Sequence, residues 1–482
     1  MSASILSQHL REQKTQFLRD DGHGWTIVMG NEAGGRLASS HDLRLRLKSS
    51  SIIPGRIDLD SIASSIGYAW YRSHAETQNI EGKTVALMPM PRSDFPLRAE
   101  NVYALAMAGV HDPFDDLLCP EDLPPDHKCT DYALVDHNSV PNPSPNKRVV
   151  AVIDHHDDDG KYHDTASPRI IEPAGSCTSL VTRLLMSGSG HISLPPDLAG
   201  LLLSAIAIDT QALRKGGKAL ETDRAAAAWL LGFVNSTERS FVAGETCTTK
   251  MLTDTDPSMP GDVIGHAWLR TLAETLRLKK FAVSHLSTRD LLRRDYKQYT
   301  LELSPFLTQE SGGVAQVGLA TVPLSLSAFF KSGSAAVLTA TTSWMEERGL
   351  TILGVLTTYR SKKDKGRREQ LWIVRDSKGA PQQQKLARTL FDGLEAEASL
   401  ALKPRTFSRY GFSGIGDAAG DDEGRDEDDD SFSHGGSTDE RPASTVNDSP
   451  FGQAFIARVY KQKNTHATRK QVAPLLKRIL GG

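Results

Sequence analysis

Two adjacent histidines lie inside a run of ionisable residues that begins where an apolar stretch ends. The apolar stretch is VVAVI at 149–153, and the run DHHDDD at 154–159 follows it directly. Five consecutive apolar residues are typical of a buried parallel strand, which would place the ionisable side chains at its carboxyl end. Such a cluster repels itself unless cations or protons neutralise it, so the pattern favours a metal site. A solvated acidic turn is the alternative.

Aspartates also lie at other predicted element ends. Asp58 and Asp60 begin a helical pattern, Asp136 follows an apolar strand, and Asp209 ends an apolar helix. Because the carboxyl ends of parallel strands share one edge of a sheet, these carboxylates can meet around two hard cations. Two metals about 4 Å apart can activate water and offset charge on a phosphoryl group. Each aspartate alone is more often a helix cap or a turn residue, but the set favours a two-metal site.

The elements that would position these residues alternate between strand and helix. Short apolar strands are predicted at 26–29, 83–88, 131–135 and 149–153, and helices begin near 58 and 97 and cover 198–208. This alternation predicts an α/β fold with a parallel sheet and a ligand crevice at its carboxyl edge. We expect this domain to span 1–235, followed by a linker at 236–253.

The pattern changes from residue 254, where a second, α+β domain is predicted to span 254–482. Residues 288–299 indicate a polar helix or turn, and an antiparallel or mixed sheet is expected from the alternating stretches 317–322, 350–359 and 370–374. The segment 413–449 is rich in Gly, Ser, Asp and Glu and is predicted to be a disordered acidic insertion.

Composition narrows the functional classes. No run of about 18 apolar residues occurs and the amino terminus has no apolar signal core, so we expect no membrane association and a cytoplasmic location. The net charge is −3, and residues 417–440 carry −10, which leaves +7 for the remainder and suits an anionic substrate. We predict that the four cysteines are reduced and have structural roles; they are Cys119, Cys129, Cys177 and Cys247.

Read together, these motifs resemble those of a known superfamily. Motifs I to IV of the DHH phosphoesterases resemble Asp58-Leu59-Asp60-Ser61, Asp136-His137-Asn138, Asp154-His155-His156 and Asp209. The signatures of a DHHA2-type second domain resemble Asp295-Tyr296-Lys297 and Arg469-Lys470-Gln471. The resemblance implies a parallel-sheet DHH domain, a smaller α+β DHHA2 domain and an active site in the cleft between them.

Relatives with this domain pair are manganese-type inorganic pyrophosphatases, fungal cytosolic exopolyphosphatases and prune-like proteins. Pyrophosphatases have histidine where this chain has Asn31, and animal prune-like proteins tend to replace the histidine that corresponds to His156. The chain therefore most resembles a fungal-type exopolyphosphatase. This resemblance implies release of orthophosphate from the ends of polyphosphate, by attack of a water molecule that two metal ions activate. The alternatives are a pyrophosphatase or a prune-like interaction protein with weak phosphodiesterase or short-chain polyphosphatase activity.

The resemblance also implies roles for individual residues. Two divalent cations, Mg²⁺ or Mn²⁺, would be bound by Asn31, Asp58, Asp60, Asp136, His155 and Asp209, and Asp154 would orient the histidines. Phosphate would be contacted by His156, Lys297, Arg469 and Lys470, with His156, Asp136 and Lys297 as catalytic residues. Outside this context each of the three cations is most simply a surface residue, and His156 a core histidine. Inorganic polyphosphate is the expected binding partner, and no nucleic acid is expected to bind. The chain is expected to be a monomer.

One segment interrupts motif I. Gly35–Ile57 separates GNEAG from DLDS, and its removal would restore the family spacing, in which the asparagine lies four residues before the first aspartate. We interpret it as a surface insertion, for which an unspliced intron is one explanation, because the segment corresponds to an in-frame stretch of small-intron size. A further motif, GSCT at 175–178, could present backbone N–H groups to an anion, or could be a plain helix cap.

Overall fold

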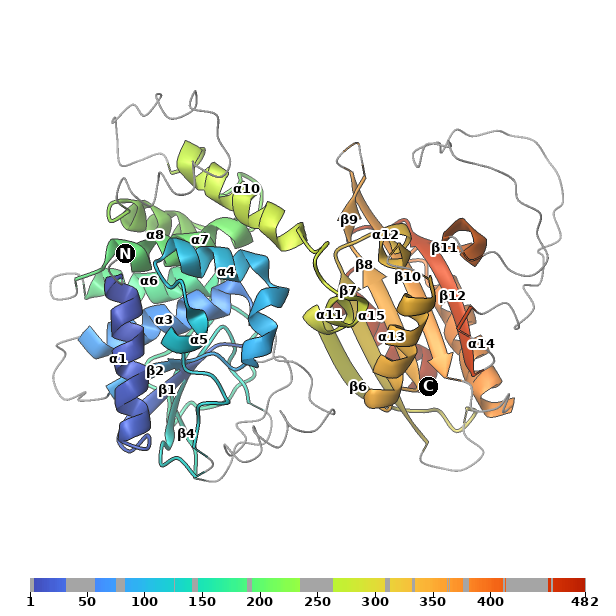
Figure 1. Cartoon of the computed structure of the whole chain (residues 1–482), viewed down its shortest axis with the longest axis horizontal. Helices are drawn as coiled ribbons and strands as arrows, with labels where there is room; N and C mark the ends of the chain where they lie inside the picture. Colours follow the sequence, from blue (N-terminus) through green and yellow to red (C-terminus); the bar gives the residue numbers. More distant parts are fainter. Residues whose placement is uncertain are drawn as a thin grey trace. The chain divides into compact units, whose positions relative to one another are not determined.

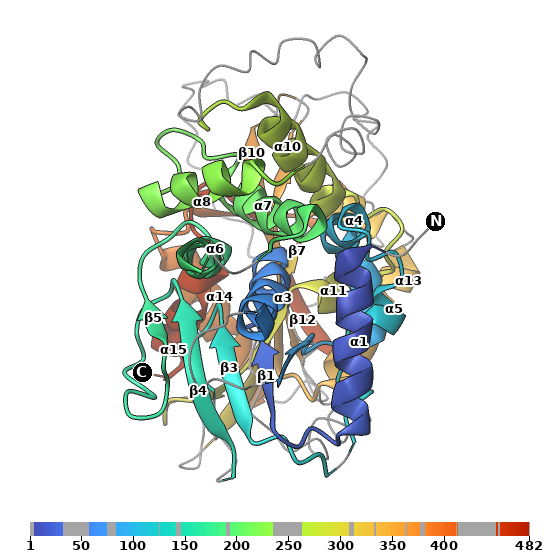
Figure 2. The ribbon, with the colours of Figure 1, turned by 90° about the vertical axis from the view of Figure 1, so that its left-hand side faces the viewer.

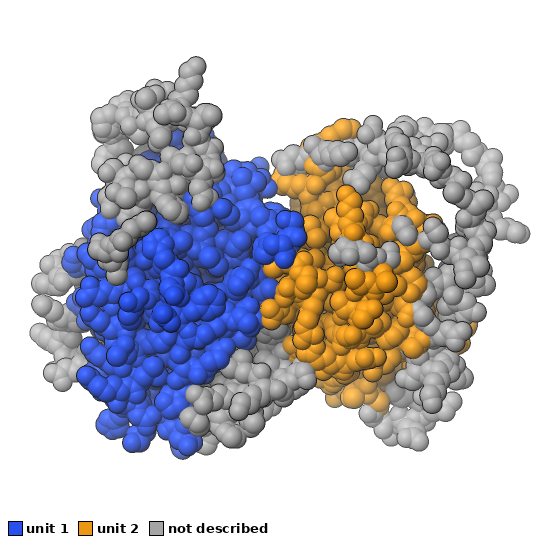
Figure 3. Space-filling model, in the orientation of Figure 1, with its two compact units in different colours: residues 1–285 blue, residues 286–482 orange. Residues whose placement is uncertain are grey.

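The computed structural model describes residues 4–31, 57–74, 83–124, 126–140, 146–188, 193–234, 263–307, 313–331, 334–361, 363, 365–375, 381–410, 412, 450–451 and 454–481. The chain forms two compact units, Met1–His285 and Leu286–Gly482, coloured separately in Figure 3. The acidic segment 413–449 and Cys247 lie outside the described residues.

A five-stranded parallel sheet forms the centre of the first unit (Figure 1). Its order is β2-β1-β3-β4-β5, with bounds Lys83–Leu87, Trp25–Met29, Asp131–Val135, Arg148–Asp154 and Arg169–Ile171. Figure 2 shows β1, β3 and β4 running side by side in the same direction. The predicted α/β fold with a parallel sheet is confirmed, and the DHH run begins at Asp154, the last residue of β4, which lies between β3 and β5.

Helices complete the first unit. They are α1 (Ile5–Arg19), α3 (Leu59–His74), η1 (Arg92–Leu97), α4 (Ala99–Met107), α5 (Pro113–Asp116), α6 (Cys177–Ser187), α7 (Pro196–Thr210), α8 (Glu221–Leu231) and α10 (Ala267–Phe281). One face of the sheet packs against α3 and α6, in a core shared with α7, α8 and α10. Gly67 lets α3 approach its neighbours closely, because a Cβ there would lie 2.8 Å from Leu202 of α7 and 3.2 Å from Val181 of α6.

The described flanks of the predicted insertion lie next to each other. A Cβ on Gly30, at the end of β1, would lie only 2.6 Å from the Cβ of Ser61 in α3. Ile57, the last residue of the predicted surface segment, is completely buried, and its carbonyl accepts a hydrogen bond from Asn101 (3.2 Å). The prediction was wrong at this residue, because an isoleucine beside the first turn of α3 contributes to the core. Residues 35–56 lie outside the described part.

The boundary between the compact units falls after α10, later than the predicted domain end at 235. The apolar face of α10 carries Leu269, Leu272 and Leu276, which are fully buried in the core of the first unit. Cys119, Cys129 and Cys177 are buried free thiols. None of the described helices combines the length and apolarity needed to cross a membrane.

The second unit is built on a mixed sheet of order β11-β12-β10-β8-β7-β6, with β9 paired to β10. The strands are β6 (Tyr296–Glu302), β7 (Val314–Val322), β8 (Ile352–Thr357), β9 (Tyr359–Arg360), β10 (Gly366–Arg375), β11 (Leu402–Arg405) and β12 (Phe455–Gln462). The helices are α11 (Thr288–Arg294), α12 (Leu326–Phe330), α13 (Ser334–Glu347), α14 (Pro381–Ala396), η3 (Phe407–Tyr410) and α15 (Arg469–Gly481). Among the described strands of this unit, β7 and β8 alone pair in parallel, so this is the predicted α+β unit with a mixed sheet.

The prediction of one polar helix or turn over 288–299 was only half right. Helix α11 ends at Arg294, and β6 begins at Tyr296 and pairs with β7 in antiparallel register. The fully buried Tyr296 ring, which packs against Trp344 with 5.2 Å between centroids, anchors the strand. Lys297 therefore lies on a strand, not on a helix.

Candidate functional site

Asp154 anchors the residues that follow β4. Its side chain is completely buried, and its Oδ1 accepts hydrogen bonds from His155 N (2.8 Å), His156 N (3.3 Å) and His156 Nδ1 (2.8 Å). Asn138, which follows β3, donates to the other oxygen (2.5 Å). Burial alone would raise the pKa of Asp154, but the hydrogen bond and charge of His156 outweigh burial and lower it. This carboxylate is therefore ionised and fixes both histidines.

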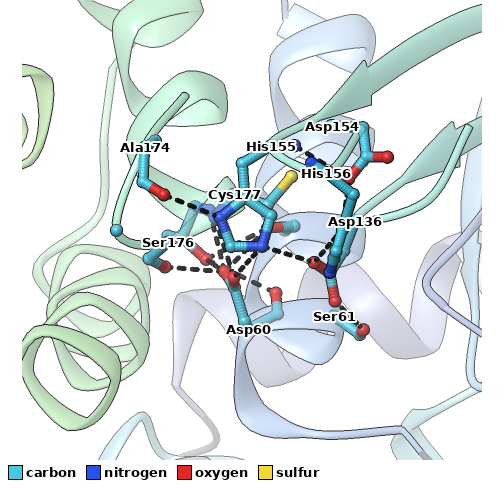
Figure 4. A network of polar contacts seen from close by, with 12 residues as sticks. Asp60, Ser61, Asp136, Asp154, His155, His156, Ala174, Ser176 and Cys177 are labelled. Carbon is cyan, nitrogen blue, oxygen red and sulfur yellow. Dashed lines mark hydrogen bonds and ion pairs between the residues drawn. The ribbon is translucent and has the colours of Figure 1, made fainter. Parts of the chain in front are cut away.

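His155 lies between a backbone carbonyl and two carboxylates (Figure 4). Nδ1 is 3.0 Å from the carbonyl oxygen of Ala174, and Nε2 is 3.2 Å from Asp136 Oδ1 and 3.9 Å from Asp60 Oδ2. Because the carbonyl can only accept, Nδ1 carries hydrogen. When the ring is neutral, the lone pair of Nε2 faces the carboxylates, which is the arrangement of a metal-ligating histidine.

Asp136 is held in an unusual backbone conformation at the end of β3. Its φ is +62°, in the left-handed region that aspartate tolerates better than most residues, and Oδ2 accepts a 2.5 Å hydrogen bond from Ser61. Burial and the charge of Asp60 raise the pKa of Asp136 to about 7. Burial acts to lower the pKa of His155, but the hydrogen bond with Asp136 and the charge of Asp60 raise it to about 9. In the metal-free protein these shifts favour a protonated His155 beside Asp136 at neutral pH.

Asp60, in the first turn of α3, is bound by the amino terminus of α6. It accepts from Cys177 N (2.7 Å), Thr178 N (2.8 Å), Ser176 Oγ (2.7 Å) and Thr178 Oγ1 (2.7 Å). Backbone N–H groups of the GSCT motif therefore donate hydrogen bonds to a carboxylate of the protein itself. Ser176 and Thr178 donate their hydroxyls to Asp60, and Ser176 makes no capping hydrogen bond from its side chain.

The other predicted metal ligands lie around this cluster. Asp58 caps α3, since its Oδ1 accepts from Ser61 N (3.1 Å). Asn31 N donates to Ser61 Oγ (3.2 Å), so the end of β1 reaches the start of α3 despite the long intervening segment. Burial and the charges of Asp60 and Asp58 raise the pKa of Asp209 well above its usual range.

His156 is 43% exposed at its side chain, which excludes a packed core histidine. Its hydrogen bond to Asp154 raises its pKa above the usual value. One potential ligand atom from each of Asp136, Asp154, His155 and His156 lies within 4.8 Å of the others. The raised pKa values of Asp136 and Asp209 and the orientation of His155 fit a divalent cation, which would relieve the repulsion between the carboxylates.

In the second unit, the two DHHA2-like motifs meet. Arg469 Nη1 donates to the carbonyl oxygen (3.0 Å) and Oδ1 (3.1 Å) of Asp295, and lies 3.3 Å from Thr321 Oγ1. Lys297 on β6 and Lys470 on α15 are exposed. The roles of these cations, and the cleft between the domains, stay predictions.

Two residues of the site network have no recognisable signal in the sequence. Ala174 contributes only its carbonyl oxygen, and Asp223 lies in ETDRAAAA, an ordinary helix start. Asp223 accepts hydrogen bonds from Gly175 N (2.8 Å) and Ser179 Oγ (2.6 Å). These contacts depend on how α6 and α8 pack, which local sequence does not reveal.

Two family models match the chain. Residues 51–206 match the DHH family, N-terminal domain, and residues 274–479 match the DHHA2 domain. The chain therefore carries a DHH family N-terminal domain followed by a DHHA2 domain, as the motifs predict. The DHH match begins after β1 and ends before Asp209.

Curated relatives of this chain are named as exopolyphosphatases or as inorganic pyrophosphatases. A Schizosaccharomyces pombe protein named "Putative exopolyphosphatase" is 33% identical over 259 residues, covering 50% of this chain and 58% of the relative. Mouse "Exopolyphosphatase PRUNE1" is 27% identical over 50% of this chain and 47% of its own. A Streptococcus thermophilus "Probable manganese-dependent inorganic pyrophosphatase" is 29% identical over 33% of this chain and 46% of its own. The chain thus spans about half the length of the curated relatives it matches.

Proposed function

We propose that this chain is a metal-dependent exopolyphosphatase that releases orthophosphate from the ends of inorganic polyphosphate. The observation that carries the proposal is the convergence of Asp60, Asp136 and His155 at the carboxyl edge of a parallel sheet, with His155 Nε2 3.2 Å from Asp136. The DHH and DHHA2 domains and the relatives named exopolyphosphatase support the substrate class.

The proposed ligands of two divalent cations, Mg²⁺ or Mn²⁺, are Asn31, Asp58, Asp60, Asp136, His155 and Asp209. Such a pair, when bound, supplies Lewis acidity, lowers the pKa of water and offsets phosphoryl charge. The protein's contribution is a set of carboxylates fixed before any ion arrives: Ser61 holds Asp136, and the first residues of α6 hold Asp60. Ala174 fixes the tautomer of His155.

His156 is the proposed phosphate contact of the first unit. Its pKa is raised by Asp154, so a larger fraction is protonated near neutral pH and can donate to a phosphoryl oxygen. Its partial exposure leaves it accessible to substrate. From the second unit, we propose that Lys297, Arg469 and Lys470 bind phosphate oxygens and stabilise the charge that grows in the transition state.

Two other functions have specific support. Pyrophosphatase activity is favoured by the manganese-dependent relatives, and Asn31 in place of histidine argues against it. A catalytically weak interaction protein is favoured by the interrupted motif I and by the −10 charge of residues 417–440 as a docking segment.

Initial rates of orthophosphate release distinguish these functions. Purified protein is assayed with long-chain polyphosphate, tripolyphosphate and pyrophosphate, in Mg²⁺, Mn²⁺ or EDTA. We expect metal-dependent release from polyphosphate and loss of nearly all activity in His155→Gln. Turnover of pyrophosphate alone would identify a pyrophosphatase, and no turnover of any substrate would support the interaction protein.

A further inference from the structure

Asp223 is a completely buried carboxylate in the first turn of α8. Its oxygens accept hydrogen bonds from Gly175 N (2.8 Å), Ser176 N (3.2 Å), Ser179 Oγ (2.6 Å) and Leu220 N (2.7 Å). Within the described part of the chain it forms no ion pair. Backbone N–H groups at the start of two helices, α6 and α8, therefore stabilise this charge.

The segment that Asp223 binds is tightly enclosed. A Cβ on Gly175 would lie 2.7 Å from Thr210 Cγ2 and 2.8 Å from Asp223 Oδ2, so only glycine lets the backbone come this close. Thr210 follows Asp209 at the end of α7. The ends of α6, α7 and α8 thus meet at one turn, and Asp223 supplies the hydrogen bonds that fix it.

Two groups of this turn orient the proposed metal ligands. The carbonyl oxygen of Ala174, next to Gly175, accepts from His155 Nδ1 (3.0 Å). Three residues further along, Thr178 donates both N (2.8 Å) and Oγ1 (2.7 Å) to Asp60. A shift of the turn would therefore release His155 and Asp60 together.

We propose that Asp223 is a positioning residue of the metal centre, which acts through the turn 174–178 to hold His155 Nε2 and Asp60 Oδ2 towards a shared cation. The inference rests on the proposed function, because it assumes that these residues bind a divalent cation. Groups that orient metal ligands without touching the metal commonly contribute about 10- to 100-fold to metal affinity.

The test compares Mn²⁺ binding by the full-length wild type and Asp223→Asn, measured as free Mn²⁺ by electron paramagnetic resonance. Asparagine has only one acceptor oxygen for four donors, so we expect the dissociation constant to rise about 10- to 100-fold. A second readout is the Nδ1–H signal of His155 in the Mg²⁺-loaded protein labelled with ¹⁵N-histidine. It should exchange slowly in the wild type and be lost to fast exchange in the variant.

Asp116→Asn is the matched control. Asp116 is 1% exposed and is held by Ser7 Oγ (2.6 Å) and Arg11 (2.7 Å), apart from the site residues. This variant should unfold at a lower temperature and bind Mn²⁺ as the wild type does. Unchanged Mn²⁺ affinity in Asp223→Asn, or an equal loss in Asp116→Asn, would overturn the inference.

Ser179→Ala covers the case in which Asp223→Asn does not fold. It removes one of the four hydrogen bonds to Asp223 and should weaken Mn²⁺ binding by about two- to fivefold. Wild-type affinity in this variant, together with a His155 Nδ1–H signal that exchanges as slowly as in the wild type, would count against the inference. Failure of the wild type itself to bind Mn²⁺ would instead refute the proposed function.

Discussion

A cation that binds to His155 and Asp136 must displace the protons that these side chains bind. The pKa of His155 is raised to about 9 and that of Asp136 to about 7, so both bind protons more strongly than usual in the metal-free protein. Metal binding therefore releases protons, and the apparent affinity should rise with pH.

We expect the Mn²⁺ affinity to rise up to tenfold per pH unit between pH 7 and 8.5, where His155 loses its proton, and more steeply below pH 7, where Asp136 is also protonated. Mn²⁺ titrations in oxygen-free buffers from pH 6 to 8.5 measure this slope. An affinity independent of pH would show that His155 is not a ligand.

The variant Asp136→Asn should affect the stability of the metal-free protein and the binding of metal in opposite directions. In the metal-free wild type, stability is lost as pH rises from about 4 towards 7, because burial opposes ionisation of Asp136. Without metal at pH 8, the variant should therefore be more stable, by at least ~1.4 kcal/mol, the value of one pKa unit. The gain should vanish at pH 4, where the wild-type carboxyl is neutral.

Thermal unfolding in EDTA, followed by circular dichroism at both pH values, gives the comparison. Added Mn²⁺ should then raise the unfolding temperature of the wild type and leave that of Asp136→Asn unchanged. A variant that is less stable than the wild type at pH 8 would contradict this account of the Asp136 charge.

At the scale of elements, helix α3 positions Asp60 through close packing at Gly67. Gly67→Ala should destabilise the protein by about 1–3 kcal/mol, since its Cβ would lie 2.8 Å from Leu202 and 3.2 Å from Val181. Gly200→Ala in α7 is the control, because its Cβ would meet only Met107 Cε at 3.6 Å, and alanine favours a helix. Urea unfolding measures the free energy of unfolding of both variants. Equal free energies of unfolding for Gly67→Ala and Gly200→Ala would refute the packing argument.

Strands were predictable where apolar runs end in polar residues, as at 131–135 and 149–153, because a buried parallel strand needs apolar side chains on both faces. Their common edge brings Asp136 and His155 together, as expected. The hydrogen bonds that Ala174 and Asp223 accept were not predictable, since they arise where helices distant in sequence pack together. The start of β6 was missed because TRDLLRRDYKQY has no clear alternation before the buried Tyr296.

At the scale of the whole molecule, the chain contains separate hydrophobic cores. The cores of the first unit draw on residues up to Leu276, and a distinct core of the second unit begins at Leu301. A ligand stabilises the part of a protein that binds it, so metal should protect the first unit selectively.

Hydrogen exchange, read by mass spectrometry with and without Mn²⁺ and in the absence of substrate, tests this expectation. Exchange should slow in peptides covering 131–140 and 154–178, and stay unchanged in β8 and β10 of the second unit. Equal protection of both units would indicate that the metal ligands are not confined to the first.

The most direct test of the central claim is a time course of polyphosphate of defined length, resolved on a gel while orthophosphate is measured in the same samples. With Mg²⁺ or Mn²⁺, orthophosphate should appear from the first time points as chains shorten from their ends, and Asp136→Asn should release none. Internal fragments without early orthophosphate, or hydrolysis of pyrophosphate with intact longer chains, would contradict the assignment as an exopolyphosphatase.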